Sequence, residues 1–302
     1  MLHRPTARRS RRATALVALT LTATALAPAA ADAAKTPKRI VAFSPFIANT
    51  LATLNVKPVA VGSPIGGSYK LSSKLRGVPR LTLSHPKGAN LEDLITLKPD
   101  LVLSSPNWRQ GTKDIKARKI TVIDGWDPQR LATVVPDVEK IAKRVGKVSA
   151  GAKLVKKIRA DVKKAKKGIT AHPRVLLVLG VGNSTSAFMP STWGGDMIKQ
   201  AGGELLTDGL KGQSLAGASG GFAPLSDEEV LARNPDVIIA VPHGAPSSIA
   251  QTTKNLANRA GWKNTTAARN GRVYVSDPDT LLQASVDPGA VIAKIRREYL
   301  KN

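Results

Sequence analysis

The hydrophobic positions of this chain form two patterns that alternate from about residue 39 onward. Short, nearly unbroken runs of Val, Ile and Leu indicate buried strands, and apolar residues at three- and four-residue spacing indicate helices. In the first third, the predicted strands are 39–43, 58–61, 100–103 and 119–123, and the predicted helices are 45–54 and 91–97. Strands that alternate with helices predict βαβ units and a mainly parallel sheet.

The middle of the chain has a helical pattern. Apolar residues recur with helical spacing over 131–145, and Asp127 followed by Pro128 predicts the start of that helix. Ser149 is the predicted cap of a second helix that continues to Lys167. At 1.5 Å per residue this second helix spans roughly 28 Å, which is long enough to cross from one lobe to another.

The alternation of strands and helices resumes in the last third. The predicted strands are 174–179, 236–241 and 272–275, and the predicted helices are 194–201, 227–232 and 290–300. The first of these strands is apolar almost throughout, which is typical of a strand with both faces covered.

One segment of the first third recurs in the last third. Residues 90–103 and 226–239 each read as a short helix, a Pro-Asp turn and a buried strand. An offset of 136 residues places Glu92 on Glu228 and Asp100 on Asp236. A shared glutamate and a shared Pro-Asp at one offset indicate a repeat of one αβ unit. The predicted fold class is therefore α/β, with two Rossmann-like lobes, mainly parallel sheets and a single long backbone helix that joins them.

The first 33 residues have a different composition. An arginine-rich start, Arg8 to Arg12, precedes an uncharged run rich in Ala, Leu and Thr that ends in small residues near Ala31 and Ala33. This order predicts a secretory signal peptide, by the general or the twin-arginine route. The predicted organisation is a signal peptide at 1–33, an N-terminal lobe at 34–127, a helical linker at 128–168 and a C-terminal lobe at 169–302.

The chain contains no cysteine. This composition excludes disulfides, thiolate metal sites and a lipid-bearing cysteine within the sequence. The expected product is exported, periplasmic or extracellular, with no lipid-anchor cysteine.

Five motifs, taken in order, resemble one known family. They are Ser44-Pro45, residues 91–102, Gly202-Gly203, residues 226–236 and residues 270–274. Together they resemble the helical-backbone, or class III, substrate-binding proteins of ABC importers for ferric siderophores, haem and cobalamin. The resemblance runs from about residue 39 to the C-terminus. Ala48-Asn49 departs from it, because many members have Thr-Glu there.

The resemblance implies a binding protein and not an enzyme. It implies no intrinsic cofactor, a ferric siderophore or haem as ligand, an ABC permease as membrane partner, no nucleic acid and a monomer. Cobalamin is the less favoured ligand, because Ser104-Ser105 stands where a tryptophan is expected.

In this family, one glutamate on each lobe docks onto arginines of the permease. Glu92 and Glu228 stand at the matching positions. Charge-assisted contacts on two lobes would fix the orientation of docking. Each carboxylate also lies in a predicted first helical turn, where it favours the helix dipole, and the two roles are compatible.

The ligand is expected between the lobes, on loops that follow the carboxyl ends of strands. The candidate ligand-binding residues on these loops are Tyr69, His85, Lys87, Trp108, Arg109, Phe188, Trp193, Phe222 and His243. Lys87 and Arg109 could meet ligand carboxylates, and packing at a lobe edge is the alternative for each aromatic residue. The loop of His243 resembles the one that carries the axial histidine of haem-binding members, so His243 is the candidate ligand of haem iron.

The charge leaves a further function open. The formal net charge is +25, and removal of residues 1–33, with five Arg and one Asp, lowers it to +21. Such a large positive net charge indicates anionic partners. Much of the charge lies in residues 153–167, which predicts either a solvated helix face or a secreted basic protein that binds acidic polymer. The sequence has no nucleophile elbow and no complete dinucleotide fingerprint, which disfavours an enzyme.

Overall fold

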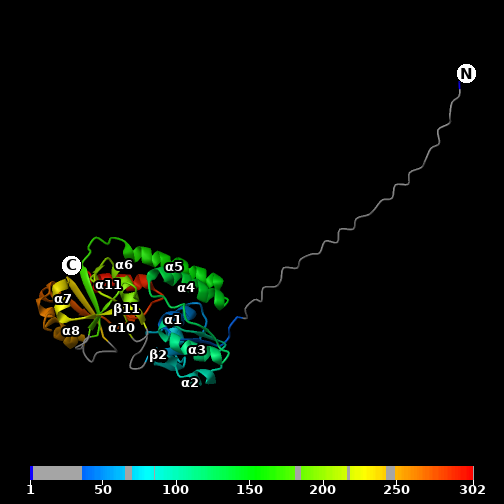
Figure 1. Ribbon diagram of the computed structural model, residues 1–302, viewed down its shortest axis with the longest axis horizontal. Helices are drawn as coiled ribbons and strands as arrows, with labels where there is room; N and C mark the ends of the chain where they lie inside the picture. The colour runs from blue at the N-terminus through cyan, green and yellow to red at the C-terminus, as the bar shows by residue number, and fades with distance from the viewer. Residues whose placement is uncertain are drawn as a thin grey trace. The chain divides into compact units, whose positions relative to one another are not determined.

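The computed structural model describes residues 1–2, 36–64, 70–84, 86–180, 185–215, 218–242 and 249–301. The chain divides into two units, Met1–Lys35 and Thr36–Asn302. The predicted signal peptide therefore falls almost entirely outside the described residues, and the second unit carries the fold (Figure 1).

The first sheet has the strand order β4-β3-β2-β1-β5-β6. Its strands are β1 (Ile40–Ala42), β2 (Ala60–Pro64), β3 (Arg80–Ser84), β4 (Gly88–Ala89), β5 (Leu101–Leu103) and β6 (Thr121–Ile123). All neighbours are parallel except β3 and β4. The helices of this lobe are α1 (Pro45–Thr53), α2 (Leu91–Thr96) and α3 (Arg109–Ala117). Alternate strand residues belong to two different core clusters, so both faces of the sheet are covered.

The second sheet has the order β10-β11-β8-β7-β12-β13, and β9 pairs with β7. Its strands are β7 (Arg174–Leu179), β8 (Thr185–Phe188), β9 (Glu204–Leu205), β10 (Gln213–Leu215), β11 (Ala218–Leu225), β12 (Val237–Val241) and β13 (Val273–Val275). The pairs of β7 with β9 and β12, and of β12 with β13, are parallel, whereas β8, β10 and β11 pair antiparallel. The helices of this lobe are α6 (Trp193–Gln200), α7 (Asp227–Arg233), α8 (Ile249–Ala257), α9 (Thr266–Arg269), α10 (Pro278–Leu281) and α11 (Pro288–Glu298). The predicted two-lobed α/β fold is confirmed: strand pairing is mainly parallel over the two sheets, and β8, β10 and β11 add an antiparallel part to the second.

Two helices, α4 (Leu131–Arg144) and α5 (Val148–Lys166), connect the sheets. The predicted start at Asp127-Pro128 is wrong, because α4 begins three residues later and its N-cap residue, Arg130, makes no side-chain cap. Instead, Asp196 of α6 accepts a hydrogen bond from the backbone N–H of Leu131 at 2.7 Å. The predicted Ser149 cap is also wrong, because α5 begins at Val148. α5 is the long helix that the sequence predicted.

One hydrophobic cluster runs through both lobes and the linker. It contains Leu101 and Leu103 of the first sheet, Val138 of α4, Ile158 of α5 and Leu177 of the second sheet, all buried. Because close-packed interiors resist deformation, this continuous core favours a small change in the angle between the lobes over a wide hinge motion.

The internal repeat has a structural reason in each lobe. Asp100 accepts hydrogen bonds from the backbone N–H groups of Lys38 and Arg39, at 2.6 and 3.0 Å, and Asp236 accepts one from Arg174 at 2.8 Å. The guanidinium of Arg39 donates to the carbonyls of Leu97 and Lys98 at the end of α2. Arg174 donates in the same way to residues 233 and 234 at the end of α7. The Pro-Asp turn therefore fastens the short helix to the start of the central strand in both lobes.

Candidate ligand site

Polar side chains gather at the carboxyl edge of the first sheet. Ser44 follows β1, Ser104 and Ser105 follow β5, and Asp127 lies in the connection after β6, and all four are buried. Ser44 caps α1 by accepting from the backbone N–H of Ile47 at 3.2 Å, and its hydroxyl donates to Asp127 at 2.8 Å. Asp127 thus joins neighbouring strand-end loops at the edge where open α/β sheets bind ligands.

Asp127 has an unusual acidity. Burial raises the pKa of this carboxyl group to about 6, against the opposing effect of hydrogen bonds from Ser105 and Ser44, and the nearby carboxyl of Asp137 adds to the rise. The carboxyl group of Asp127 therefore changes its protonation state near pH 6. It lies beside the loops expected to hold the ligand.

We expect the Asp127→Asn substitution to remove a pH dependence of stability. The folded pKa of about 6 exceeds the pKa of 3.8 of a free aspartate. The carboxyl group therefore stabilises the fold below pH 3.8, and this contribution is lost as the pH rises through 6. The shift corresponds to about 3 kcal/mol. In urea unfolding, the variant should therefore gain about 3 kcal/mol relative to wild type between pH 4 and pH 7.

The exposed Asp114, which makes no side-chain bond within the described part of the chain, provides the matched control. For Asp114→Asn, the difference from wild type in the free energy of unfolding should change little over the same pH range. If the difference in unfolding free energy between Asp127→Asn and wild type also stayed constant with pH, Asp127 would not be a buried group of raised pKa.

Two candidate cations lie near the same edge. Arg109 begins α3, and its Nε donates to Asp124 at 3.3 Å with the arginine side chain 63% exposed. Thr112 also donates to Asp124, at 3.1 Å. Lys87 is exposed and makes no side-chain bond among the described residues. Both cations are accessible to a ligand carboxylate, because neither is buried.

The four described candidate aromatics lie in the core. Trp108 packs in the cluster under α3, and Phe188 and Phe222 face each other across β8 and β11, edge to face at 4.9 Å. Trp193 donates from its indole N–H to the carbonyl of Thr280 at 3.2 Å. All four are at most 8% exposed. The positions of these four rings show the alternative role, packing in the core. Contact between these rings and a ligand stays a prediction.

The carboxyl edge of the second sheet carries an ionic cluster after β13. Lys294 of α11 pairs with Asp277, and Thr280 donates to the same carboxylate. Although burial opposes the shift, these hydrogen bonds lower the pKa of Asp277. Burial raises the pKa of Asp279, which accepts from the backbone N–H of Lys70 at 3.1 Å. This contact joins the two lobes at their carboxyl edges.

Three candidate residues, Tyr69, His85 and His243, lie outside the described residues. In sequence, they follow β2, β3 and β12, three strands whose carboxyl ends reach the edges described above. Their ligand roles, including haem iron ligation by His243, stay predictions.

Glu92 and Glu228 occupy equivalent places in the two lobes. Each is the second residue of its helix and is exposed, and neither forms an ion pair among the described residues. Asn90 caps α2 by accepting from the N–H groups of Glu92 and Asp93. Ser226 and Glu229 form a capping box on α7. Because other side chains cap both helices, these two glutamates remain available for a partner.

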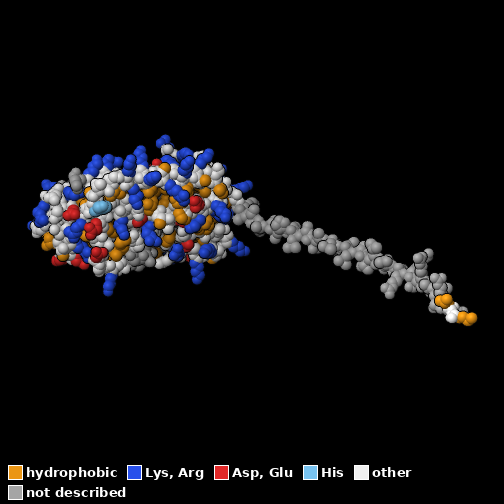
Figure 2. Space-filling view, turned by 90° about the horizontal axis from the view of Figure 1, so that it is seen from above, with side chains coloured by type: hydrophobic (Ala, Val, Ile, Leu, Met, Phe, Trp, Pro, Cys, Tyr) orange, Lys and Arg blue, Asp and Glu red, His pale blue; other side chains and the backbone are white. Residues whose placement is uncertain are grey.

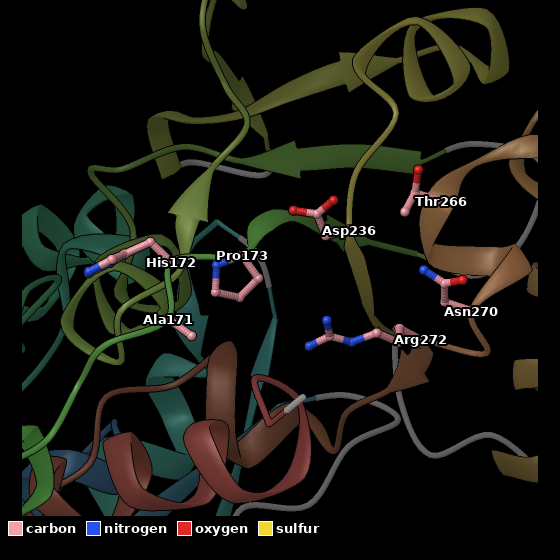
Figure 3. Close-up of a pocket in the computed structure, with 7 residues that line it drawn as sticks. All are labelled: Ala171, His172, Pro173, Asp236, Thr266, Asn270 and Arg272. Carbon is pink, nitrogen blue, oxygen red and sulfur yellow. The ribbon is translucent and has the colours of Figure 1, made fainter.

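A hollow of about 360 Å³ lies at the opposite, amino-terminal edge of the second sheet (Figure 3). Asp236, His172 and Arg272 line it, but their polar groups already serve the fold. Asp236 holds the start of β7, the Nδ1 of His172 lies 3.0 Å from the carbonyl of Gly202, and Arg272 donates to Lys301. This hollow is therefore not the candidate ligand site.

Sequence reasoning missed Asp127, Asp277 and Asp279 as site residues. The Asp127-Pro128 sequence is typical of a helix start, and the Asp277-Pro278-Asp279 sequence is typical of a turn. Their position directly after predicted strands was the available signal, because polar residues at carboxyl ends meet at one edge of the sheet.

A model of the periplasmic binding protein family matches residues 40–280. The substrate-binding lipoprotein YvrC of Bacillus subtilis, an uncharacterized ABC transporter component, is 25% identical over 257 residues, 83% of this chain and 76% of YvrC. IsdE, a high-affinity heme uptake system protein of Staphylococcus aureus, is 24% identical over 87% of this chain and 88% of IsdE. The structure of IsdE with heme superposes with a TM-score of 0.71, covering 87% of this chain and 99% of IsdE, at 23% identity.

A third relative is a protein of the ABC-type Fe³⁺-hydroxamate transport system from Saccharomonospora viridis. Its structure gives a TM-score of 0.65 at 19% identity and covers 86% of this chain and 92% of that protein. The two-lobed α/β fold is the one these substrate-binding proteins share. The chain belongs to the periplasmic binding protein family.

This assignment confirms the predicted resemblance and the prediction of a binding protein. Within the described residues, the structure contains no helix that is long and apolar enough to cross a membrane.

Proposed function

We propose that the chain captures an iron complex, a ferric siderophore or haem, between its lobes and delivers it to an ABC permease. The observation that carries the proposal is the family match over residues 40–280 on a two-lobed fold. The polar carboxyl edges of the lobes, joined through Lys70 and Asp279, support the placement of the ligand there.

Two relatives support the choice of cargo. IsdE belongs to a heme uptake system, and the S. viridis protein belongs to an Fe³⁺-hydroxamate system. His243 favours haem, because it follows β12 in sequence and a neutral imidazole is a good ligand of iron. Arg109 and Lys87 suit either cargo, because both cations are exposed near the same edge and could pair with carboxylates.

Haem binding can be tested with the His243→Ala variant. Haemin should shift the Soret band of the wild-type protein and saturate at one equivalent, and His243→Ala should remove the shift or lower the affinity at least tenfold. His172→Ala is the matched control, because His172 lies at the amino-terminal edge of the second sheet and should bind haemin as wild type does. A Soret shift of equal size and affinity in both variants would remove the role of His243. No saturable Soret shift in the wild type, with saturable quenching by a ferric siderophore, would assign the cargo as siderophore.

A further inference from the structure

α5 carries a dense row of cations that the fold does not use. Residues 147–167 contain nine Lys or Arg and one Asp. Seven of these cations are exposed and have side chains that make no hydrogen bond or ion pair within the described part of the chain. We call the five that lie within α5 the α5 cationic face: Lys153, Lys156, Arg159, Lys163 and Lys164. By contrast, Lys157 pairs with Asp161, and Lys166 donates to Gln200.

The stability of the helix does not explain this face. The opposite side of α5 packs through the buried Leu154, Val155 and Ile158. On the exposed side, Lys153 with Lys156 and Arg159 with Lys163 stand three and four residues apart. Like charges at such spacing destabilise a helix by roughly 0.2–0.5 kcal/mol per pair. The negative charge of a bound polyanion would offset the repulsion between these cations.

The shape beside the face favours a long and narrow partner. α5 has 19 residues and is therefore about 28 Å long. A groove of about 700 Å³ lies along the line where α5 packs against α11. Lys164, Arg297 and Lys301 line it together with the carboxylates of Asp161 and Asp287. In Figure 1, α5 runs along the top of the unit, and Figure 2, seen from above, shows Lys and Arg over much of that side of the unit.

The chemistry of the face favours phosphate over lipid tails or bases. Val148 is the only large hydrophobic residue of α5 or α11 among the exposed ones in the described chain, so the face offers little to insert into a bilayer. α5 and α11 contain no aromatic residue on which bases could stack. An extended polymer of phosphate groups needs neither feature.

We infer that the α5 cationic face binds a linear phosphate polymer, at a site separate from the carboxyl edges where the ligand is expected. Binding releases the counterions of the neutralised phosphates. With about five phosphates neutralised, the logarithm of the association constant should fall against the logarithm of salt with a slope of about −3.5.

Long-chain inorganic polyphosphate is the probe, titrated into the mature chain at 50–300 mM NaCl. The test variant replaces Lys153, Lys156, Arg159, Lys163 and Lys164 with Gln. The control variant has the same net charge and replaces five exposed cations of other elements that make no side-chain bond among the described residues: Lys57, Lys113, Lys116, Arg118 and Lys263. Circular dichroism establishes that both variants are folded.

The test variant should lose at least tenfold in affinity at 100 mM NaCl and most of the salt slope, while the control variant stays within twofold of wild type. Equal losses in the two variants would overturn the inference, because binding would then follow net charge alone. Tighter binding to phosphatidylglycerol vesicles, or to single-stranded DNA of equal charge, would overturn the polymer assignment in favour of a membrane or a nucleic acid. Ligand titrations distinguish this inference from the proposed function, because the face contains none of the candidate ligand residues.

Discussion

The Trp262→Ala substitution should lower the free energy of unfolding by about 3–5 kcal/mol, the range typical of deleting a fully buried tryptophan. Trp262 is completely buried in the cluster on one face of the second sheet. Its indole N–H donates to Asp227 at 2.9 Å, and the guanidinium of Arg259 lies over its ring at 5.3 Å. Arg259 also donates to Asp227, at 3.0 Å. The substitution leaves a cavity and removes a partner of a half-buried carboxylate.

A second variant separates these two effects. Trp262→Phe keeps an aromatic ring but removes the indole N–H, and the expected loss is about 1–2 kcal/mol, since Asp227 keeps Arg259. Urea unfolding of both variants measures the losses. A loss below 1 kcal/mol for Trp262→Ala would contradict this description of the core. The network lies beside the proposed docking residue, because Asp227 begins α7 and immediately precedes Glu228.

Replacing Glu92 and Glu228 together with Ala should abolish uptake of the ligand and leave its affinity for the protein within twofold of wild type. Both carboxylates are exposed at equivalent positions of α2 and α7, and neither is used for capping. Loss of charge-assisted contacts on both lobes would prevent productive orientation on the permease. Each single variant should reduce uptake less than the pair does.

Uptake is measured as accumulation of the iron complex in cells that contain the cognate permease. The control removes the same charge elsewhere, at the exposed Asp114 and Glu139, which make no side-chain bond among the described residues, and should transport as wild type does. Normal uptake by the Glu92 and Glu228 double variant would remove the docking proposal.

The sequence predicted the parallel core of both lobes well. β1, β5, β7, β12 and β13 lie within the predicted strands, because strands covered on both faces are almost entirely apolar. It did not predict β3, which alternates exposed and buried residues over only five positions. It also did not predict β11, whose sequence contains two Gly and one Pro, residues that are depleted in strands.

Helix starts and site residues were harder to predict because tertiary contacts decide them. Asp127 precedes a proline and has the local sequence of a cap, yet it hydrogen-bonds Ser44 across 83 residues of chain. Asp196, in α6, accepts the hydrogen bond from the first backbone N–H of α4 instead. The exposure of Trp108 and Phe222 depends in the same way on distant neighbours, such as Phe188 for Phe222. The equivalent positions of Glu92 and Glu228 could be predicted, because the repeat places both glutamates at one offset. Their docking role stays a prediction.

The central claim is capture of one iron complex between the lobes, and equilibrium titration of the mature wild-type protein tests it most directly. Haemin, a ferric hydroxamate and a ferric catecholate would each be titrated, with haem followed by absorbance and the siderophores by tryptophan fluorescence. Our account predicts saturable binding of one class of iron complex at one equivalent per chain. The absence of saturable binding to all three, by a folded protein, would contradict it.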